Sequence, residues 1–135
     1  MIVVDTNIIG YLFLTSSKST LTEQALQKDS LWAAPLLWRS EMRNVLALYI
    51  RKGHLSLADA QQIMKEASDL MQSQEYEVTS NQVLELVNIS TCSAYDCEFV
   101  ALARDLNVSL VSVDRQILKN FPDTAISLET FVEAK

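Results

Sequence analysis

Residues 2–7 read Ile2-Val3-Val4-Asp5-Thr6-Asn7, where three branched aliphatic residues run directly into a carboxylate. A short run of branched aliphatic residues predicts a buried strand. Asp, Thr and Asn often begin helices, because their side-chain oxygens accept hydrogen bonds from free backbone N–H groups. The apolar residues over 8–14 predict the helix that follows. The stretch therefore predicts a strand–helix unit with an acid at the junction.

The same pattern recurs along the chain. Leu110-Val111-Ser112-Val113 predicts a strand that ends in Asp114. Other strands are predicted over residues 31–34, 76–79 and 125–128, with helices over 21–28, 37–51, 56–72, 80–89 and 94–106 and a short helix at the C-terminus. Strands that alternate with helices predict a parallel sheet covered on both faces, which is a three-layer α/β/α domain. No repeat or linker divides the chain, so we expect one domain over residues 1–135.

Composition restricts the class of function. Of 135 residues 49% are hydrophobic, and 17 Asp and Glu outnumber 11 Lys and Arg for a net charge of −6. The hydrophobic content excludes a disordered acidic tail, and the charge argues at face value against binding nucleic acid by a basic surface. No apolar run approaches a membrane span, and the N-terminus lacks the positive segment of a signal peptide. Two cysteines fit reduced core thiols, so we expect a cytoplasmic protein without membrane contact.

Histidine and glycine chemistry is poorly represented. The single histidine, His54, lies beside Gly53 in a predicted turn, and no nucleophile-elbow motif accompanies it. Gly10 and Gly53 are too far apart to form a phosphate-binding loop. These observations argue against a serine-hydrolase triad and against a nucleotide-binding loop.

Four carboxylates occupy unusual positions. Asp5 and Asp114 each end an apolar strand, where parallel sheets bind their ligands. For either acid taken alone, a helix cap is at least as good an explanation. Glu41 and Asp96 lie on the apolar faces of their helices, where a carboxylate is costly unless it is paired or binds a metal. The other acids, Glu75 among them, are predicted on solvated faces.

Two explanations of the four acids compete. One is buried salt bridges, for which Arg39, Arg43 and Arg104 are the candidate partners. The other is a hard-cation site, because carboxylates without Cys or His ligands suit Mg²⁺ or Mn²⁺. Such an ion polarises a phosphoryl oxygen and activates water, so phosphodiester hydrolysis would need no histidine. One or two ions are equally compatible with the sequence, and they would reduce the net charge of −6 to −4 or −2.

Four motifs occur in order across nearly the whole chain. They are Val3-Val4-Asp5-Thr6-Asn7-Ile8-Ile9, Ser40-Glu41-Met42-Arg43-Asn44-Val45-Leu46, Tyr95-Asp96-Cys97-Glu98-Phe99-Val100-Ala101-Leu102-Ala103 and Ser112-Val113-Asp114-Arg115. Together they resemble the motifs of the PIN-domain endoribonucleases, in particular the VapC-type toxins of bacterial toxin–antitoxin pairs. Cys97 departs from the usual small residue, and Ser112 replaces the more frequent Thr while keeping its hydroxyl.

The resemblance implies a three-layer PIN-like nuclease domain with a central, mainly parallel five-stranded sheet. It also implies a divalent-metal-dependent endoribonuclease that uses Mg²⁺ or Mn²⁺, acts on RNA, forms a homodimer and is inhibited by a cognate antitoxin. The residues it implies as metal ligands and catalytic groups are Asp5, Glu41, Asp96 and Asp114. Thr6, Asn44 and Ser112 would support them.

Two pairs of basic residues lie close to the motifs. Arg39 and Arg43 share a helix face, and Arg115 and Lys119 are spaced in the same way after Asp114. They are candidate RNA contacts, which would position phosphates without reading sequence. Solvated surface cations explain each of them equally well.

Other functions remain open at this stage. Phosphotransfer on a strand-end Asp is disfavoured, because Asp5-Thr6-Asn7 lacks the second Asp of a phosphatase motif and no lysine follows the predicted fifth strand where a receiver domain would need one. A non-catalytic metal-binding or RNA-binding module is another possibility, although all four acids are present. A PIN-fold RNA-processing nuclease without a toxin role is the third alternative.

Overall fold

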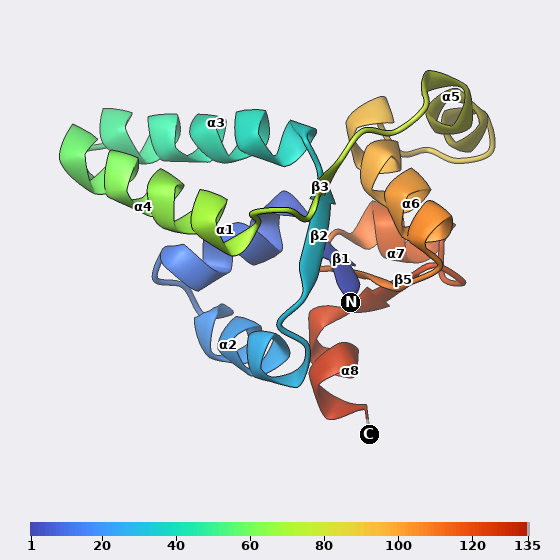
Figure 1. The fold of residues 1–135 in the computed structure, drawn as a ribbon, viewed down its shortest axis with the longest axis horizontal. Helices are drawn as coiled ribbons and strands as arrows, with labels where there is room; N and C mark the ends of the chain where they lie inside the picture. Colours follow the sequence, from blue (N-terminus) through green and yellow to red (C-terminus); the bar gives the residue numbers. More distant parts are fainter. Residues whose placement is uncertain (135) are drawn as a thin grey trace.

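A computed structural model describes residues 1–134; Lys135, the last residue of the expected domain, lies outside the described part. Five strands form one sheet in the order β3-β2-β1-β4-β5, and every neighbouring pair is parallel (Figure 1). The strands are β1 Ile2–Val4, β2 Trp32–Pro35, β3 Glu75–Tyr76, β4 Leu110–Ser112 and β5 Ala125–Ser127. The predicted parallel five-stranded sheet is therefore confirmed.

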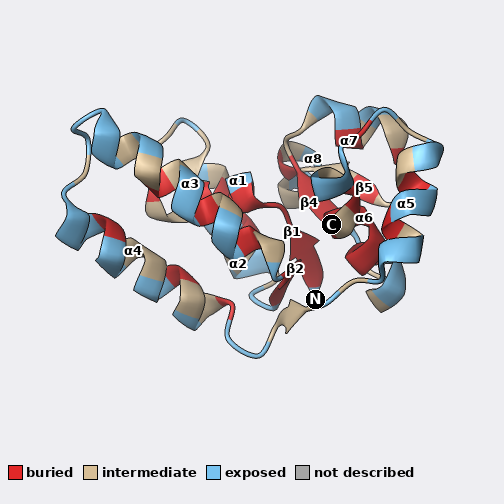
Figure 2. Cartoon of the chain, turned by 90° about the horizontal axis from the view of Figure 1, so that it is seen from above, coloured by how far each residue is buried: buried red, intermediate tan, exposed pale blue. Residues whose placement is uncertain are grey.

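Eight helices lie on the two sides of the sheet within residues 1–134. They are α1 Thr6–Phe13, α2 Ser19–Lys28, α3 Leu37–Arg51, α4 Leu57–Leu70, α5 Ser80–Asn88, α6 Ala94–Leu106, α7 Arg115–Asn120 and α8 Leu128–Glu133. Figures 1 and 2 show α1 to α4 on one side and α5 to α7 on the other, the predicted three-layer arrangement. Within residues 1–134, the helices are too short or too polar to cross a membrane.

Strands β1 and β4 are completely buried. All residues of β1 and β4 are buried, and Val3 of β1 lies opposite Ala33 of β2 and Leu110 of β4 (Figure 2). A strand buried on both faces reads as a continuous apolar run, which is why neither strand shows alternation. Polar residues begin where these two strands end, so polar side chains gather at one edge of the sheet.

The third strand lies earlier than predicted, over Glu75–Tyr76 instead of residues 76–79. Its partner β2 ends at Pro35, opposite Tyr76, and the chain then turns into α3. Residues beyond Tyr76 therefore have no strand to pair with, and Thr79 instead caps α5 through a side-chain bond to the Gln82 N–H. Local sequence could not show this limit, because it is imposed by the neighbouring strand.

The prediction for Glu75 was wrong. Its side chain is only 11% exposed, and it accepts hydrogen bonds from the Trp38 indole at 2.7 Å and from the Arg39 guanidinium at 2.6 Å. These partners lie in α3, more than 35 residues away in the chain. The glutamate thus anchors the start of α3 to the edge strand β3.

Candidate functional site

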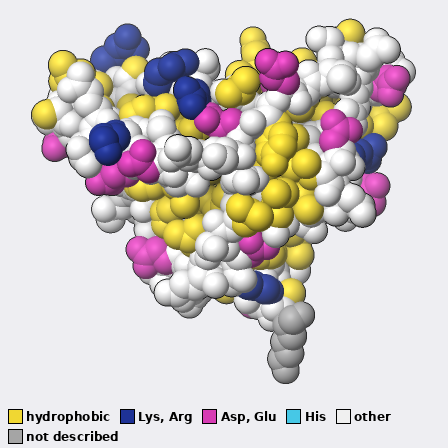
Figure 3. All heavy atoms as spheres, in the orientation of Figure 1, with side chains coloured by type: hydrophobic (Ala, Val, Ile, Leu, Met, Phe, Trp, Pro, Cys, Tyr) yellow, Lys and Arg dark blue, Asp and Glu magenta, His cyan; other side chains and the backbone are white. Residues whose placement is uncertain are grey.

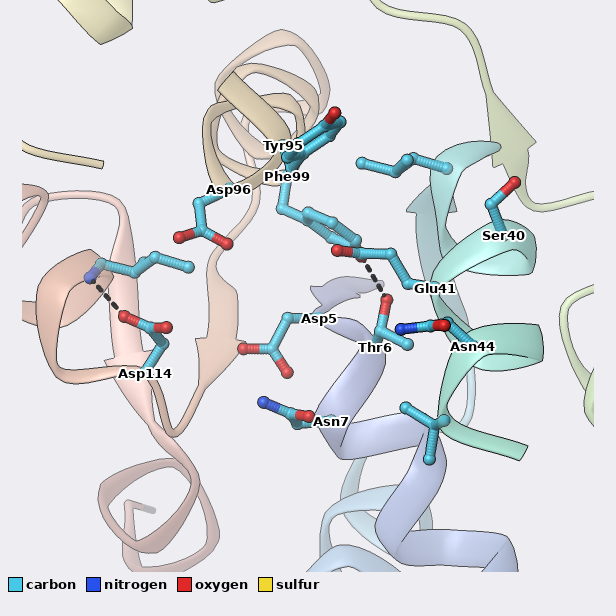
Figure 4. Close-up of a pocket in the computed structure, with 13 residues that line it drawn as sticks. Asp5, Thr6, Asn7, Ser40, Glu41, Asn44, Tyr95, Asp96, Phe99 and Asp114 are labelled. Carbon is cyan, nitrogen blue, oxygen red and sulfur yellow. Dashed lines mark hydrogen bonds between the residues drawn. The ribbon is translucent and has the colours of Figure 1, made fainter. Parts of the chain in front are cut away.

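A cavity of about 350 Å³ lies at the carboxyl ends of β1 and β4, between the first turns of α3 and α6 (Figure 4). All four predicted carboxylates line it: Asp5, Glu41, Asp96 and Asp114. The supporting residues Thr6 and Asn44 line it as well. Its described lining contains no Lys, Arg or His. The structure therefore gathers the acids of all four motifs around one space without a basic side chain.

Asp5 is both a helix cap and part of this cavity. Its side chain accepts hydrogen bonds from the backbone N–H of Ile8, at 3.2 Å, and from the hydroxyl of Ser112. The residue is only 6% exposed. Burial raises the pKa of Asp5 from 3.8 to about 6, and the negative charges of Asp114 and Asp96 add to the rise, while the two hydrogen bonds oppose it. The capping role and the site role are therefore not alternatives.

Asp114 is built in the same way. Its Oδ1 atom accepts the backbone N–H groups of Gln116, at 2.8 Å, and Ile117, at 3.1 Å, which begins α7. Its own N–H donates to the Ser112 hydroxyl at 3.0 Å. Ser112 is fully buried. Its hydroxyl donates to the Asp5 carboxylate and accepts the Asp114 N–H, so it links the two strand-end acids.

Glu41 and Asp96 face the cavity from two helices. The Thr6 hydroxyl donates to Glu41 Oε1 at 2.7 Å, which links α1 to α3. Ser93 caps α6 by accepting the Asp96 N–H at 3.1 Å. Burial raises the pKa of both carboxyls, and Asp96 adds to the effect at Glu41 as Asp114 does at Asp96. Each acid therefore lies in the field of another.

The salt-bridge explanation does not hold within residues 1–134, where none of the four acids forms an ion pair. The three candidate arginines have other partners. Arg39 pairs with Glu75, Arg104 pairs with Asp123 at 3.4 Å, and Arg43 donates to the Ser40 hydroxyl at 3.0 Å. The negative charge at the cavity is therefore not neutralised by basic side chains of the described chain.

The donor set fits a hard divalent cation, because it consists of carboxylate, hydroxyl and amide oxygens. In residues 1–134 no group of three or more His, Cys, Asp or Glu is close enough together to hold an ion. Like charges in a partly buried cavity repel each other, which opposes a tighter arrangement without a cation. The support for a cation at this place is therefore the chemistry of the donor set.

The four predicted RNA contacts lie outside the cavity lining. Arg39, Arg43, Arg115 and Lys119 are all exposed. Figure 3 shows Lys and Arg side chains gathered along the upper left edge of the molecule, over α3. Arg43 is next to the cavity through its bond to Ser40, which lines it, whereas Arg39 is engaged by Glu75.

Seven lining residues were not predicted as site residues, and the three of them with polar side-chain groups are Asn7, Ser40 and Tyr95. Each is next to a predicted site residue in the chain, so adjacency was the only available signal. Tyr95 precedes Asp96 at the start of α6, and its helical position does not indicate that both side chains reach the same cavity.

Comparisons with known proteins agree with this architecture. The sequence profile of the PIN domain matches residues 2–123. Ribonuclease VapC3 of Pyrobaculum aerophilum is 25% identical over 124 residues, which cover 90% of this chain and 95% of that protein. The crystal structure of PAE2754 from Pyrobaculum aerophilum has a TM-score of 0.76 at 21% identity, covering 96% of this chain and 92% of that one. A chain of a toxin-antitoxin complex from Klebsiella pneumoniae has a TM-score of 0.69 at 16% identity, covering 95% and 98%.

Proposed function

This chain belongs to the PIN-domain family, and on that premise we propose that it is a divalent-metal-dependent endoribonuclease, the toxin of a toxin–antitoxin pair. The observation that carries the proposal is the convergence of Asp5, Glu41, Asp96 and Asp114 on one cavity whose described lining has no basic side chain. A related ribonuclease and a fold neighbour from a toxin-antitoxin complex support the biological role.

The chain's own residues supply positioning. Asp5, Glu41, Asp96 and Asp114 would hold Mg²⁺ or Mn²⁺, with the Ser112 and Thr6 hydroxyls fixing the orientation of Asp5 and Glu41. When bound, the ion supplies Lewis acidity toward the scissile phosphate and lowers the pKa of water. Asn44, which lines the cavity together with Glu41, would donate a hydrogen bond to a phosphate oxygen. The reaction class is hydrolysis of an RNA phosphodiester bond.

RNA would reach the cavity past exposed cations. Arg43 beside Ser40, and Arg115 and Lys119 on α7, would contact phosphates on opposite sides of the site. Arg39 would contribute less, because Glu75 already neutralises it. Such contacts place the strand and leave base recognition to other groups.

The partners follow the same proposal. A cognate antitoxin with a basic segment would complement the net charge of −6 and the acidic cavity. We also propose a homodimer, which sedimentation velocity would detect as twice the monomer mass. The two free, buried cysteines are compatible with a cytoplasmic location, where thiols stay reduced.

The test is cleavage of single-stranded RNA by the purified chain with Mn²⁺ or with a chelator. Asp96→Asn should abolish cleavage and weaken Mn²⁺ binding in calorimetry, because it removes a charged ligand but keeps the shape. Asp105→Asn is the matched control, since Asp105 is an exposed acid on the same helix. Full activity of the Asp96 variant would refute the site. Absence of Mn²⁺ binding and of cleavage in the unmodified chain would favour a non-catalytic module.

A further inference from the structure

Tyr95 stands apart from every other aromatic residue in residues 1–134. Its side chain is 63% exposed, whereas every other Phe, Tyr and Trp in this part of the chain is buried or half-buried. This one exposed aromatic side chain also lines the carboxylate cavity. Tyrosine is enriched at binding interfaces, because its ring is apolar and its hydroxyl tolerates water, so its position at the cavity points to a role in binding.

The surroundings of Tyr95 are apolar on the cavity side. Leu37, from the start of α3, and the buried Phe99 also line the cavity. Figure 4 shows the Tyr95 ring beside Phe99 at one end of the cavity, with its hydroxyl directed away from Asp5 and Asp96. Within residues 1–134 the Tyr95 hydroxyl forms no hydrogen bond with the protein. The tyrosine whose hydroxyl does form one is Tyr76, which donates to Gln74. Because the hydroxyl points away from the carboxylates, the ring is the part of the Tyr95 side chain nearest to them.

Charge explains why such a surface is needed. The chain carries a net charge of −6, and the described cavity lining has no Lys or Arg with which to attract a polyanion. Base stacking on an aromatic ring contributes about 1–3 kcal/mol per base and does not depend on the sign of the surface. Proteins that bind unpaired RNA bases commonly use aromatic rings in this way.

We propose that Tyr95 is a substrate-binding residue on whose ring an unpaired nucleobase stacks, next to the phosphate that a divalent cation held by Asp96 would bind. This inference rests on the proposed RNA hydrolysis and deepens it, because it names the residue that would contact a base beside the cleaved bond. In a duplex both faces of each internal base are covered by neighbours, so the ring has nothing to stack on.

The test compares Tyr95→Ala and Tyr95→Phe with the unmodified chain in Mn²⁺-dependent cleavage of a single-stranded RNA oligonucleotide. Tyr95→Ala should lower kcat/KM about 5- to 150-fold, which corresponds to the loss of one stacked base. Tyr95→Phe keeps the ring and should stay within about 3-fold. Ile89→Ala, which removes another exposed apolar side chain (67%) away from the cavity, is the matched control and should leave the rate unchanged.

A second measurement separates stacking from a structural role. After the cleavage site is mapped, each flanking nucleotide is replaced in turn by an abasic ribose. At one position this should slow the unmodified chain as much as Tyr95→Ala does, with no further loss in the variant. The salt dependence of RNA binding should keep its slope, because no charge is removed. Calorimetric Mn²⁺ affinity should also stay unchanged, which shows that Asp96 is undisturbed.

Several results would overturn the assignment. One is unchanged cleavage by Tyr95→Ala, and another is a loss of activity in Tyr95→Phe equal to that in Tyr95→Ala. The third is an abasic substitution that slows Tyr95→Ala as much as it slows the unmodified chain. A sedimentation change in Tyr95→Ala that matches its loss of activity would instead place Tyr95 at a contact between protein chains. If the unmodified chain binds Mn²⁺ but leaves RNA intact, the proposed function fails and this inference falls with it. RNA cleavage that is indifferent to Tyr95 leaves the function standing and refutes only the inference.

Discussion

Replacing Asp5 by Asn should stabilise the metal-free protein at neutral pH, although it removes a proposed ligand. Burial raises the pKa of Asp5 from 3.8 to about 6 in the folded state. Between these pH values the folded chain keeps a proton that the unfolded chain has released, so stability falls as pH rises through this window. At 1.36 kcal/mol per pKa unit, the loss amounts to about 3 kcal/mol by pH 7.

The Asn side chain carries no charge to desolvate and can keep both contacts of Asp5. Its oxygen can accept the Ile8 N–H, and its amide can donate to the Ser112 hydroxyl. The free energy of unfolding of Asp5→Asn should therefore exceed that of the unmodified chain by up to about 3 kcal/mol at pH 7. The gain should shrink steadily toward pH 4.

Urea unfolding from pH 4 to pH 8 in a chelating buffer measures this difference. Adding Mn²⁺ should then stabilise the unmodified chain more than the variant, because binding to the folded state adds to its stability. Asp105→Asn serves as control, since it removes one charge from the same acidic chain at an exposed position. A variant less stable than the unmodified chain at pH 7 would refute the reasoning, because it would show that the charge of Asp5 stabilises the fold. An equal gain in Asp105→Asn would show that net charge, not burial, is responsible.

Three further changes test the structure around the site. Ser112→Ala should lower the free energy of unfolding in urea by about 1.5–3 kcal/mol, because it removes a buried hydrogen-bond donor to a carboxylate. The helix-cap variant Ser127→Ala should lose only about 1 kcal/mol, and an equally small loss in Ser112→Ala would contradict the prediction. Glu75→Gln should cost about 1 kcal/mol at pH 7, since its partner Arg39 is 46% exposed. The Arg39 pair lowers the pKa of Glu75, so this difference should fade as the pH drops below 4.5; a difference that persists in acid would refute the charge pairing. Arg43→Gln should reduce the slope of log RNA affinity against log salt by about 0.7, and Arg39→Gln by less; equal effects would show that Glu75 does not neutralise Arg39.

The local pattern predicted the parts of the fold that depend on neighbours in the chain. Ile2-Val3-Val4 followed by Asp5 is a strand and a cap in any context that buries the strand, and the same holds before Asp114. Once the strands are parallel, their carboxyl ends meet at one edge. The convergence of these two acids thus follows from sequence and topology.

Long-range contacts explain what could not be predicted. Glu75 seemed a solvated acid, because its partners in α3 are more than 35 residues away in the chain. The pair Arg39–Glu75 also removes one cation from those available to RNA. No periodicity in the sequence encodes such a pairing, since it depends on how β3 docks beside α3.

Residue type and spacing were enough to assign the α/β class, the four acids and their order, because strands, caps and apolar helix faces are short-range properties. The folded chain added the environment of those acids. It buries Asp5, joins it to Asp114 through the Ser112 hydroxyl, leaves all four acids without ion-pair partners in residues 1–134, and sets Tyr95 at their side. Burial and charge depend on groups that meet only after the chain has packed, so these properties follow from the tertiary structure.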